Sequence, residues 1–139
     1  HTAFNNTEII KSYSNDIPEI CIDAEKIKQV FINLIMNANH AMNFSGNLYI
    51  KTTFENEKIR IDLEDTGEGI DKDILSRIFD PFFTTKPTGK GTGLGLSVSY
   101  GIVKNHGGDI TVESVKNSGT TFSIYLPADN TCVIGDQNE

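Results

Sequence analysis

The spacing of apolar residues changes once between residues 27 and 63, and this change restricts the folds that the chain can adopt. Up to Met42, apolar residues recur at intervals of three and four, as they do along one face of a helix. From Leu48 to Leu63 they alternate with polar residues, as they do on strands that are buried on one side. The sequence therefore predicts one long helix, with Asp23 as its N-cap, followed by an antiparallel hairpin. The apolar face of this helix consists of Ile27, Val30, Phe31, Leu34, Ile35, Ala38 and Met42.

The other expected elements also place strands in pairs. In chain order, we expect strands at residues 9–14 and 20–22, the long helix to about residue 42, strands at 48–54 and 59–63, helices at 72–78 and 94–104, and strands at 110–115 and 121–126. Leu94, Val98 and Ile102 would form the apolar stripe of the last helix, which the glycines after His106 would end. Because the strands come in hairpins, the pattern predicts an α+β fold, a two-layer α/β sandwich with a mixed, mostly antiparallel sheet and helices on one face.

Length and composition fit one globular domain. The 139 residues suffice for a single core, which we expect at residues 9–127, between a frayed segment at 1–8 and a polar tail at 128–139. No apolar run is long enough for a membrane span, and no leader is expected. The net charge of −7 argues against a nucleic-acid surface, but not against ATP held by a metal and backbone N–H groups. Cys21 and Cys132 are expected to be reduced thiols.

Three polar residues follow one line of the long helix. Asn33, Asn37 and His40 lie at positions i, i+4 and i+7, beside the apolar face. Asparagine is a poor helix former, so two asparagines one turn apart indicate a need for polar partners. Their carbonyl oxygens suit a hard cation such as Mg²⁺. The alternative is an ordinary solvated helix face.

A carboxylate and two glycines follow the predicted hairpin, in the segment Asp65-Thr66-Gly67-Glu68-Gly69-Ile70. The glycines allow the backbone to approach a ligand closely. Asp65 could accept a hydrogen bond from the exocyclic amine of a base, and Ile70 could cover an apolar ring. The alternative is an ordinary turn in which Gly67 and Gly69 adopt positive φ.

A glycine-rich segment, Gly89-Lys90-Gly91-Thr92-Gly93-Leu94-Gly95-Leu96, leads directly into the last predicted helix. Its spacing fits neither the Walker A nor the Rossmann pattern. It nevertheless offers phosphate oxygens a close backbone and the N–H groups of a helix N-terminus, and Lys86 and Lys90 could add positive charge. The alternative is a flexible linker. Upstream, Phe79, Phe82 and Phe83 flank Pro81 and could anchor this loop to the core or dock a partner.

These segments together resemble the sequence boxes of sensor histidine kinases. Residues 33–41 are similar to the N box, 65–70 to the G1 box, 79–83 to the F box and 91–96 to the G2 box, and Gly119-Thr120-Thr121-Phe122 resembles the short motif before the last strand. All five come in the family order and cover about residues 20–127. Phe-Phe-Thr-Thr-Lys at 82–86 is also similar to the NtrB-like branch. The resemblance implies a Bergerat-type ATP-binding fold.

The resemblance also implies a role for individual residues. Asn37 would coordinate Mg²⁺, Asn33 would lie near the metal water or the phosphates, and Asp65 would bind the adenine amino group. Residues 84–93 would form the ATP lid, in which Lys86 would contact a phosphate. The remaining nucleotide contacts would be His40 on a phosphate, Ala41, Gly67, Gly69, Ile70, Ile78, Leu96 and Thr121 around adenine and sugar, and Thr84, Thr85, Gly91, Thr92, Gly93, Leu94 and Gly95 around the phosphates.

Two departures from the family pattern narrow the expected chemistry. Thr84 stands where many relatives carry an arginine. Asn33 stands where related hydrolytic ATPases carry a glutamate base, so fast ATP hydrolysis is not expected. The histidines are His1, His40 and His106, and none lies in a phosphoacceptor context.

We therefore expect a cytoplasmic, monomeric domain that presents ATP to a histidine on a separate dimerisation domain, acts upstream of a response regulator, and does not autophosphorylate alone. The alternatives are a nucleotide-sensing or docking module and a serine kinase of the anti-sigma type.

Overall fold

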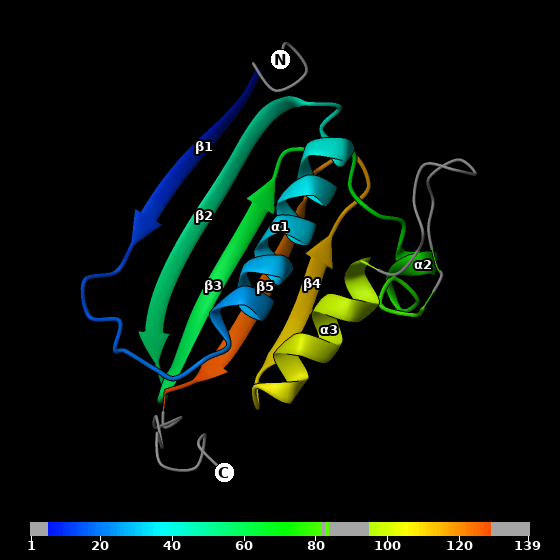
Figure 1. The fold of residues 1–139 in the computed structure, drawn as a ribbon. Helices are drawn as coiled ribbons and strands as arrows, with labels where there is room; N and C mark the ends of the chain where they lie inside the picture. The colour runs from blue at the N-terminus through cyan, green and yellow to red at the C-terminus, as the bar shows by residue number, and fades with distance from the viewer. Residues whose placement is uncertain (1–5, 82, 84–94, 129–139) are drawn as a thin grey trace.

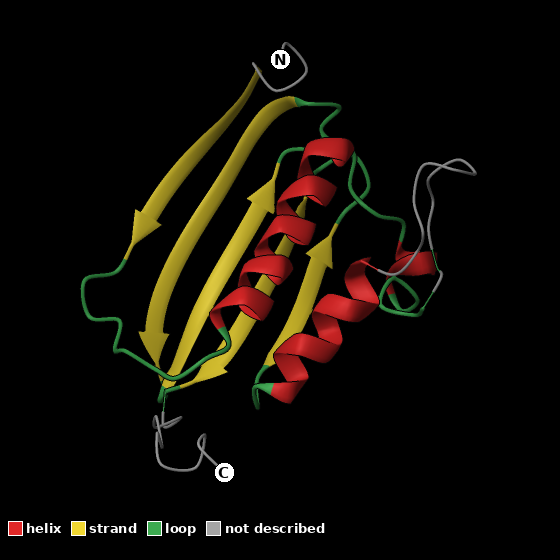
Figure 2. Cartoon of the chain, viewed as in Figure 1, coloured by secondary structure: helices red, strands yellow, loops and turns green. Residues whose placement is uncertain are grey.

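The computed structural model describes residues 6–81, 83 and 95–128, in which one sheet is covered on one face by helices (Figures 1 and 2). The elements are β1 (Asn6–Tyr13), α1 (Ala24–Ala41), β2 (Ser45–Glu55), β3 (Lys58–Asp65), α2 (Lys72–Leu75), α3 (Gly95–Asn105), β4 (Asp109–Ser114) and β5 (Thr120–Pro127). The strand order is β1-β2-β3-β5-β4. β1 runs parallel to β2, and all the other pairs are antiparallel. The predicted α+β sandwich is confirmed.

The segment between β1 and α1 differs from the prediction. No strand forms at residues 20–22, and β1 pairs with β2, so there is no N-terminal hairpin. Ile17 and Ile20 pack partly buried against the core, which explains why apolar residues occur in this loop. Cys21 is disulfide-bonded, so the prediction of a reduced thiol is wrong for this residue, whereas Cys132 lies outside the described residues.

The long helix forms as predicted. The Asp23 carboxylate accepts a hydrogen bond from the backbone N–H of Lys26 at 3.3 Å, which satisfies one free donor of the first turn. α1 packs over β3 and beside α3. Its predicted apolar face lies in or against the core, and Val30 and Leu34 are almost fully buried.

The hairpin of β2 and β3 also forms as predicted. Leu48 lies opposite Asp65, and Phe54 lies opposite Ile59. Asn56 and Glu57 make the two-residue turn with φ values of 54° and 62°. Two successive residues with positive φ give the turn whose twist suits an antiparallel hairpin. This register places Asp65 at the end of β3, beside β5.

The buried face of α3 matches the predicted one at Ile102 but not at Val98. Ser99, Ile102 and Val103 are buried, whereas Val98 is 38% exposed; Leu94 lies outside the described residues. A search for apolar spacing passes over Ser99, which can be buried because its hydroxyl has a hydrogen-bond partner. The predicted helix at 72–78 is shorter, Lys72–Leu75. None of the helices in the described part of the chain is long and apolar enough to cross a membrane.

His106 connects the end of α3 to the start of α1. Its Nε2 accepts a hydrogen bond from the backbone N–H of Asp23 at 3.0 Å, and its Nδ1 donates to the carbonyl of Ile102 at 2.8 Å. Gly107 then ends the helix with a φ of 76°, as predicted for this glycine termination. One imidazole therefore holds the two helix ends together.

We expect His106→Ala to lower the free energy of unfolding by about 1–3 kcal/mol, because the Asp23 N–H loses its partner and the Ile102 carbonyl loses one of its two donors. Urea denaturation measures this loss. The control is His40→Ala, because His40 is exposed and its Nδ1 bonds only to the carbonyl of Met36 in its own helix. That change should shift the value by less than about 0.5 kcal/mol. Equal effects of the two substitutions would contradict the helix-joining role of His106.

Candidate nucleotide-binding site

Asp65 is the most buried ionisable group among the described residues of the candidate site. Its side chain is 5% exposed at the end of β3. Oδ1 accepts hydrogen bonds from the backbone N–H of Gly67 at 2.8 Å and of Thr120 at 3.3 Å. Both bonds go to the same oxygen, so neither uses Oδ2. The carboxylate is thus fixed by one oxygen and can accept a donor from a ligand through the other.

Burial raises the pKa of Asp65 above its ordinary value. The hydrogen bonds from Gly67 and Thr120 act in the opposite direction, and the charge of Glu64 adds to the rise. The ionised carboxylate therefore costs the folded domain free energy that an exposed aspartate would not cost. A buried carboxylate of this kind is typical of functional sites.

The two glycines after β3 lie against different neighbours. A Cβ at Gly67 would lie 2.7 Å from the carbonyl of Ala41, the last residue of α1. The backbone N–H of Glu68 also donates to the Ala41 carbonyl at 3.1 Å. A Cβ at Gly69, whose φ is 73°, would lie 2.1 Å from the carbonyl of Val115. The segment thus fits between the end of α1 and the β4–β5 turn only because glycine occupies these positions.

Hydrogen bonds to the β4–β5 region hold the same segment. The backbone N–H of Ile70 donates to the Ser114 hydroxyl at 2.7 Å, and that hydroxyl lies 2.7 Å from the Thr120 hydroxyl. Thr120 in turn donates its N–H to Asp65. Ser114 and Thr120 are site residues that the sequence analysis missed.

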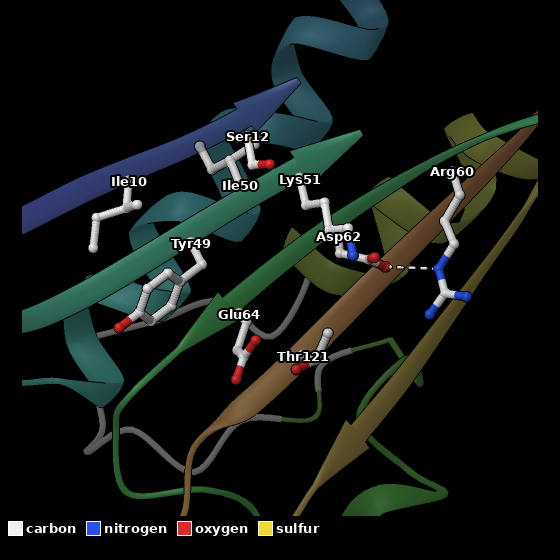
Figure 3. Close-up of a pocket in the computed structure, with 9 residues that line it drawn as sticks. All are labelled: Ile10, Ser12, Tyr49, Ile50, Lys51, Arg60, Asp62, Glu64 and Thr121. Carbon is white, nitrogen blue, oxygen red and sulfur yellow. Dashed lines mark hydrogen bonds and ion pairs between the residues drawn. The ribbon is translucent and has the colours of Figure 1, made fainter. Parts of the chain in front are cut away.

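Thr121 does not join this cluster. Its side chain lies on the helix-free face of the sheet, in a pocket that it shares with Tyr49, Lys51, Arg60 and Glu64 among others (Figure 3). The strand alternation explains the difference, because Phe122 and Ile124 of β5 face the core, as does Thr120. The structure therefore brings Thr120 to Asp65, and a nucleotide contact by Thr121 stays a prediction.

Asn33, the first residue of the asparagine line (Asn33, Asn37 and His40), contacts α3. Asn33 Nδ2 donates to the carbonyl of Gly95 and to the hydroxyl of Ser99, both at 3.2 Å. Asn37 lies half-buried one turn later, whereas His40 is exposed and its ring packs edge-on against Phe44. The described residues contain no cluster of three or more His, Cys, Asp or Glu side chains that could hold a metal.

The F-box segment packs against the end of the sandwich. Ile78 is 4% exposed and belongs to the core. The ring of Phe79 lies 5.3 Å from that of Tyr100 and 6.3 Å from that of Phe122. Leu96, in the first turn of α3, is partly buried against the same core. This region is an apolar packing anchor, which was one of the two roles left open by the sequence.

Several predicted phosphate contacts lie outside the described residues. These are Thr84, Thr85, Lys86, Gly91, Thr92, Gly93 and Leu94, together with Lys90. Gly95 is described, and its carbonyl accepts the Asn33 bond. The described part of the site therefore comprises Asp65 with its hydrogen-bond partners after β3, and Asn33 beside the start of α3.

Comparison of the sequence and the fold with known proteins shows the class of protein to which this chain is similar. The sequence profile of the family described as histidine kinase-, DNA gyrase B-, and HSP90-like ATPase matches residues 22–130. The sensor kinase CckA of Brucella abortus (strain 2308) is 40% identical over 135 residues, covering 86% of this chain and 14% of CckA. The catalytic domain of histidine kinase ThkA has a TM-score of 0.77 at 35% identity, covering 88% of this chain and 80% of that domain. ThkA in complex with the response regulator TrrA has a TM-score of 0.74 at 31% identity, covering 90% of this chain and 35% of that one.

The fold and the matched profile define an ATP-binding α+β sandwich domain. The chain belongs to the histidine kinase-, DNA gyrase B- and HSP90-like ATPase family, as an ATP-binding catalytic domain of the two-component histidine kinase type. It spans only 14% of the length of CckA, so the relatives contain much that this chain does not.

Proposed function

We propose that this domain presents the γ-phosphate of ATP to a histidine on a separate dimerisation domain. The observation that carries the proposal is the fixed, buried Asp65, whose Oδ2 is left to accept a hydrogen bond from a ligand. A hydrogen-bond acceptor beside apolar residues suits the exocyclic amine of adenine. We propose that Ala41, Gly69, Ile70, Ile78 and Leu96 complete the adenine site.

We propose that Asn37 coordinates Mg²⁺ and that Asn33 lies beside the metal water or the phosphates. Amide oxygens are hard ligands, and the lack of a carboxylate or histidine cluster among the described residues fits an ion that takes few protein ligands. When bound, Mg²⁺ would neutralise charge on the phosphate oxygens. The contribution of this chain would be to hold and orient the nucleotide.

The acceptor histidine is proposed to lie outside this chain. Both ring nitrogens of His106 are engaged, one with Asp23 and the other with Ile102. His40 uses Nδ1 for the carbonyl of Met36 within the N box itself. Because His106 is engaged at both nitrogens and His40 belongs to the N box, we propose that the acceptor lies on a partner domain of the same protein.

We expect the chain incubated with γ-labelled ATP to retain no stable label, and to label a phosphoacceptor domain on histidine when the two are mixed. Gel autoradiography with acid and base treatment of the product measures this, because phosphohistidine is acid-labile. Asn37→Ala should abolish the transfer. Asn105→Ala, at an exposed position at the end of α3, should not. Stable label on the isolated chain would refute the proposal that the acceptor histidine lies on a separate domain.

Downstream, we propose a response regulator as the receiver of the phosphoryl group, and no nucleic-acid partner. A relative, ThkA, has been solved with its response regulator TrrA.

We also propose that the domain is monomeric when isolated and works in the cytoplasm. A reducing cytoplasm would open the disulfide at Cys21, so trapping of free thiols in cells tests the location.

A further inference from the structure

Ser99 presents a polar group at a position where the sandwich otherwise buries apolar side chains. It lies in the middle of α3 and is 0% exposed. The Ser99 hydroxyl accepts a hydrogen bond from Asn33 Nδ2 at 3.2 Å, across 66 residues of sequence. The pair joins α3 to the helix that carries the asparagine line.

The hydrogen bonds to Gly95 and Ser99 also determine which way the side-chain amide of Asn33 is turned. The carbonyl oxygen of Gly95 can only accept hydrogen bonds, so the group of Asn33 that faces it must be the amide nitrogen. Nδ2 has two hydrogens, and it has two acceptors in Gly95 and Ser99. Both hydrogens are thereby used. Asn33 can then meet a ligand only through its carbonyl oxygen, Oδ1.

We propose that Ser99 is a positioning residue that holds the Asn33 amide so that Oδ1 is directed to the metal–phosphate side of the site. This inference rests on the proposed function, and it adds a residue that acts through Asn33. The last side-chain torsion of asparagine is broad and is fixed by hydrogen bonds rather than by a staggered well. Without the Ser99 hydroxyl, only the Gly95 carbonyl still holds the amide, so the amide is less firmly oriented and more often presents its NH₂ group, which repels a cation but donates to a bare phosphate.

Loss of the Ser99 hydroxyl should therefore make nucleotide affinity less dependent on Mg²⁺. We expect Ser99→Ala to reduce the ratio of nucleotide affinity with Mg²⁺ to affinity with EDTA by about three- to tenfold, the effect of one lost hydrogen bond. The affinity in EDTA should change little. Isothermal titration of this chain with a non-hydrolysable ATP analogue, with excess Mg²⁺ and with EDTA, measures both values.

Ser123→Ala is the matched control. Ser123 is also buried, at 4% exposure, and its hydroxyl donates to the Asp62 carboxylate at 2.6 Å. It lies in β5 and faces the helix-free side of the sheet, next to Asp62. Both serine substitutions should lower the thermal midpoint similarly, but Ser123→Ala should leave the Mg²⁺ ratio unchanged.

A double-mutant cycle tests whether Ser99 acts through Asn33. In an Asn33→Ala background, Ser99→Ala should produce no further change in the ratio. A further reduction there, or an equal loss of affinity with Mg²⁺ and with EDTA, would overturn the positioning role and leave the proposed function standing. If the unaltered chain bound nucleotide without any response to Mg²⁺, the proposed metal site would fail, and this inference with it.

Discussion

Asp65→Asn is expected to weaken ATP binding by about 30- to 1000-fold, corresponding to about 2–4 kcal/mol, while the domain stays folded. Asparagine keeps an oxygen for the N–H groups of Gly67 and Thr120. It then places an amide nitrogen where Oδ2 stood, so that a donor faces the adenine amine. Because burial disfavours the native carboxylate, thermal stability should be unchanged or slightly higher. Titration calorimetry and thermal melting measure the two effects.

The matched control for this substitution is Asp62→Asn. Asp62 also lies on β3, but on the helix-free face its carboxylate binds Arg60 at 2.9 Å (Figure 3). The same carboxylate accepts a hydrogen bond from the Ser123 hydroxyl. The Asp62→Asn substitution should leave ATP affinity unaltered. If both variants bound ATP as the unaltered chain does, Asp65 would not be the adenine acceptor.

Acid should reproduce part of the Asp65→Asn effect. The raised pKa of Asp65 means that it is protonated at a higher pH than an ordinary aspartate. ATP affinity should therefore fall as the pH drops through that pKa. The contribution of Asp65 to the stability of the free domain should change in the opposite direction. Its folded pKa lies above its unfolded one, so stability rises as the pH falls through the folded pKa.

Gly69→Ala is expected to lower the free energy of unfolding by about 3 kcal/mol or more. The new Cβ would lie 2.1 Å from the carbonyl of Val115, and the φ of 73° is itself unfavourable for alanine. Relief requires the segment after β3 to move away from the β4–β5 turn, which also displaces Ile70. Urea denaturation measures the loss, and ATP affinity should fall with it.

Gly101→Ala is the contrasting glycine substitution. Gly101 lies within α3, and a Cβ there would meet nothing within 4 Å. Alanine is the better helix former, so this change should stabilise the domain by about 0.5–1 kcal/mol. If Gly69→Ala were as harmless as Gly101→Ala, close packing of the segment against the turn would not be a requirement of the fold.

For the proposed adenine side of the site, the sequence motif and the backbone sterics of the structure agree. Asp65, Gly67 and Gly69 lie together, and both glycines are required by backbone contacts. Motif matching chose Thr121, whereas the two-residue alternation of β5 would have chosen Thr120. Periodicity along a strand was thus a better guide to side-chain direction than the position within a box.

The sequence by itself determined the features that depend on residues close to one another along the chain. The face of α1, its cap at Asp23 and the turn of the β2–β3 hairpin follow from local spacing and local sterics. The tertiary structure alone decided the parallel pairing of β1, the buried face of α3 and the orientation of two functional side chains. Asp65 is held by Thr120, 55 residues away, and Asn33 by Ser99, 66 residues away. Such hydrogen bonds form only when burial brings distant segments together, and no local pattern records which atoms will meet.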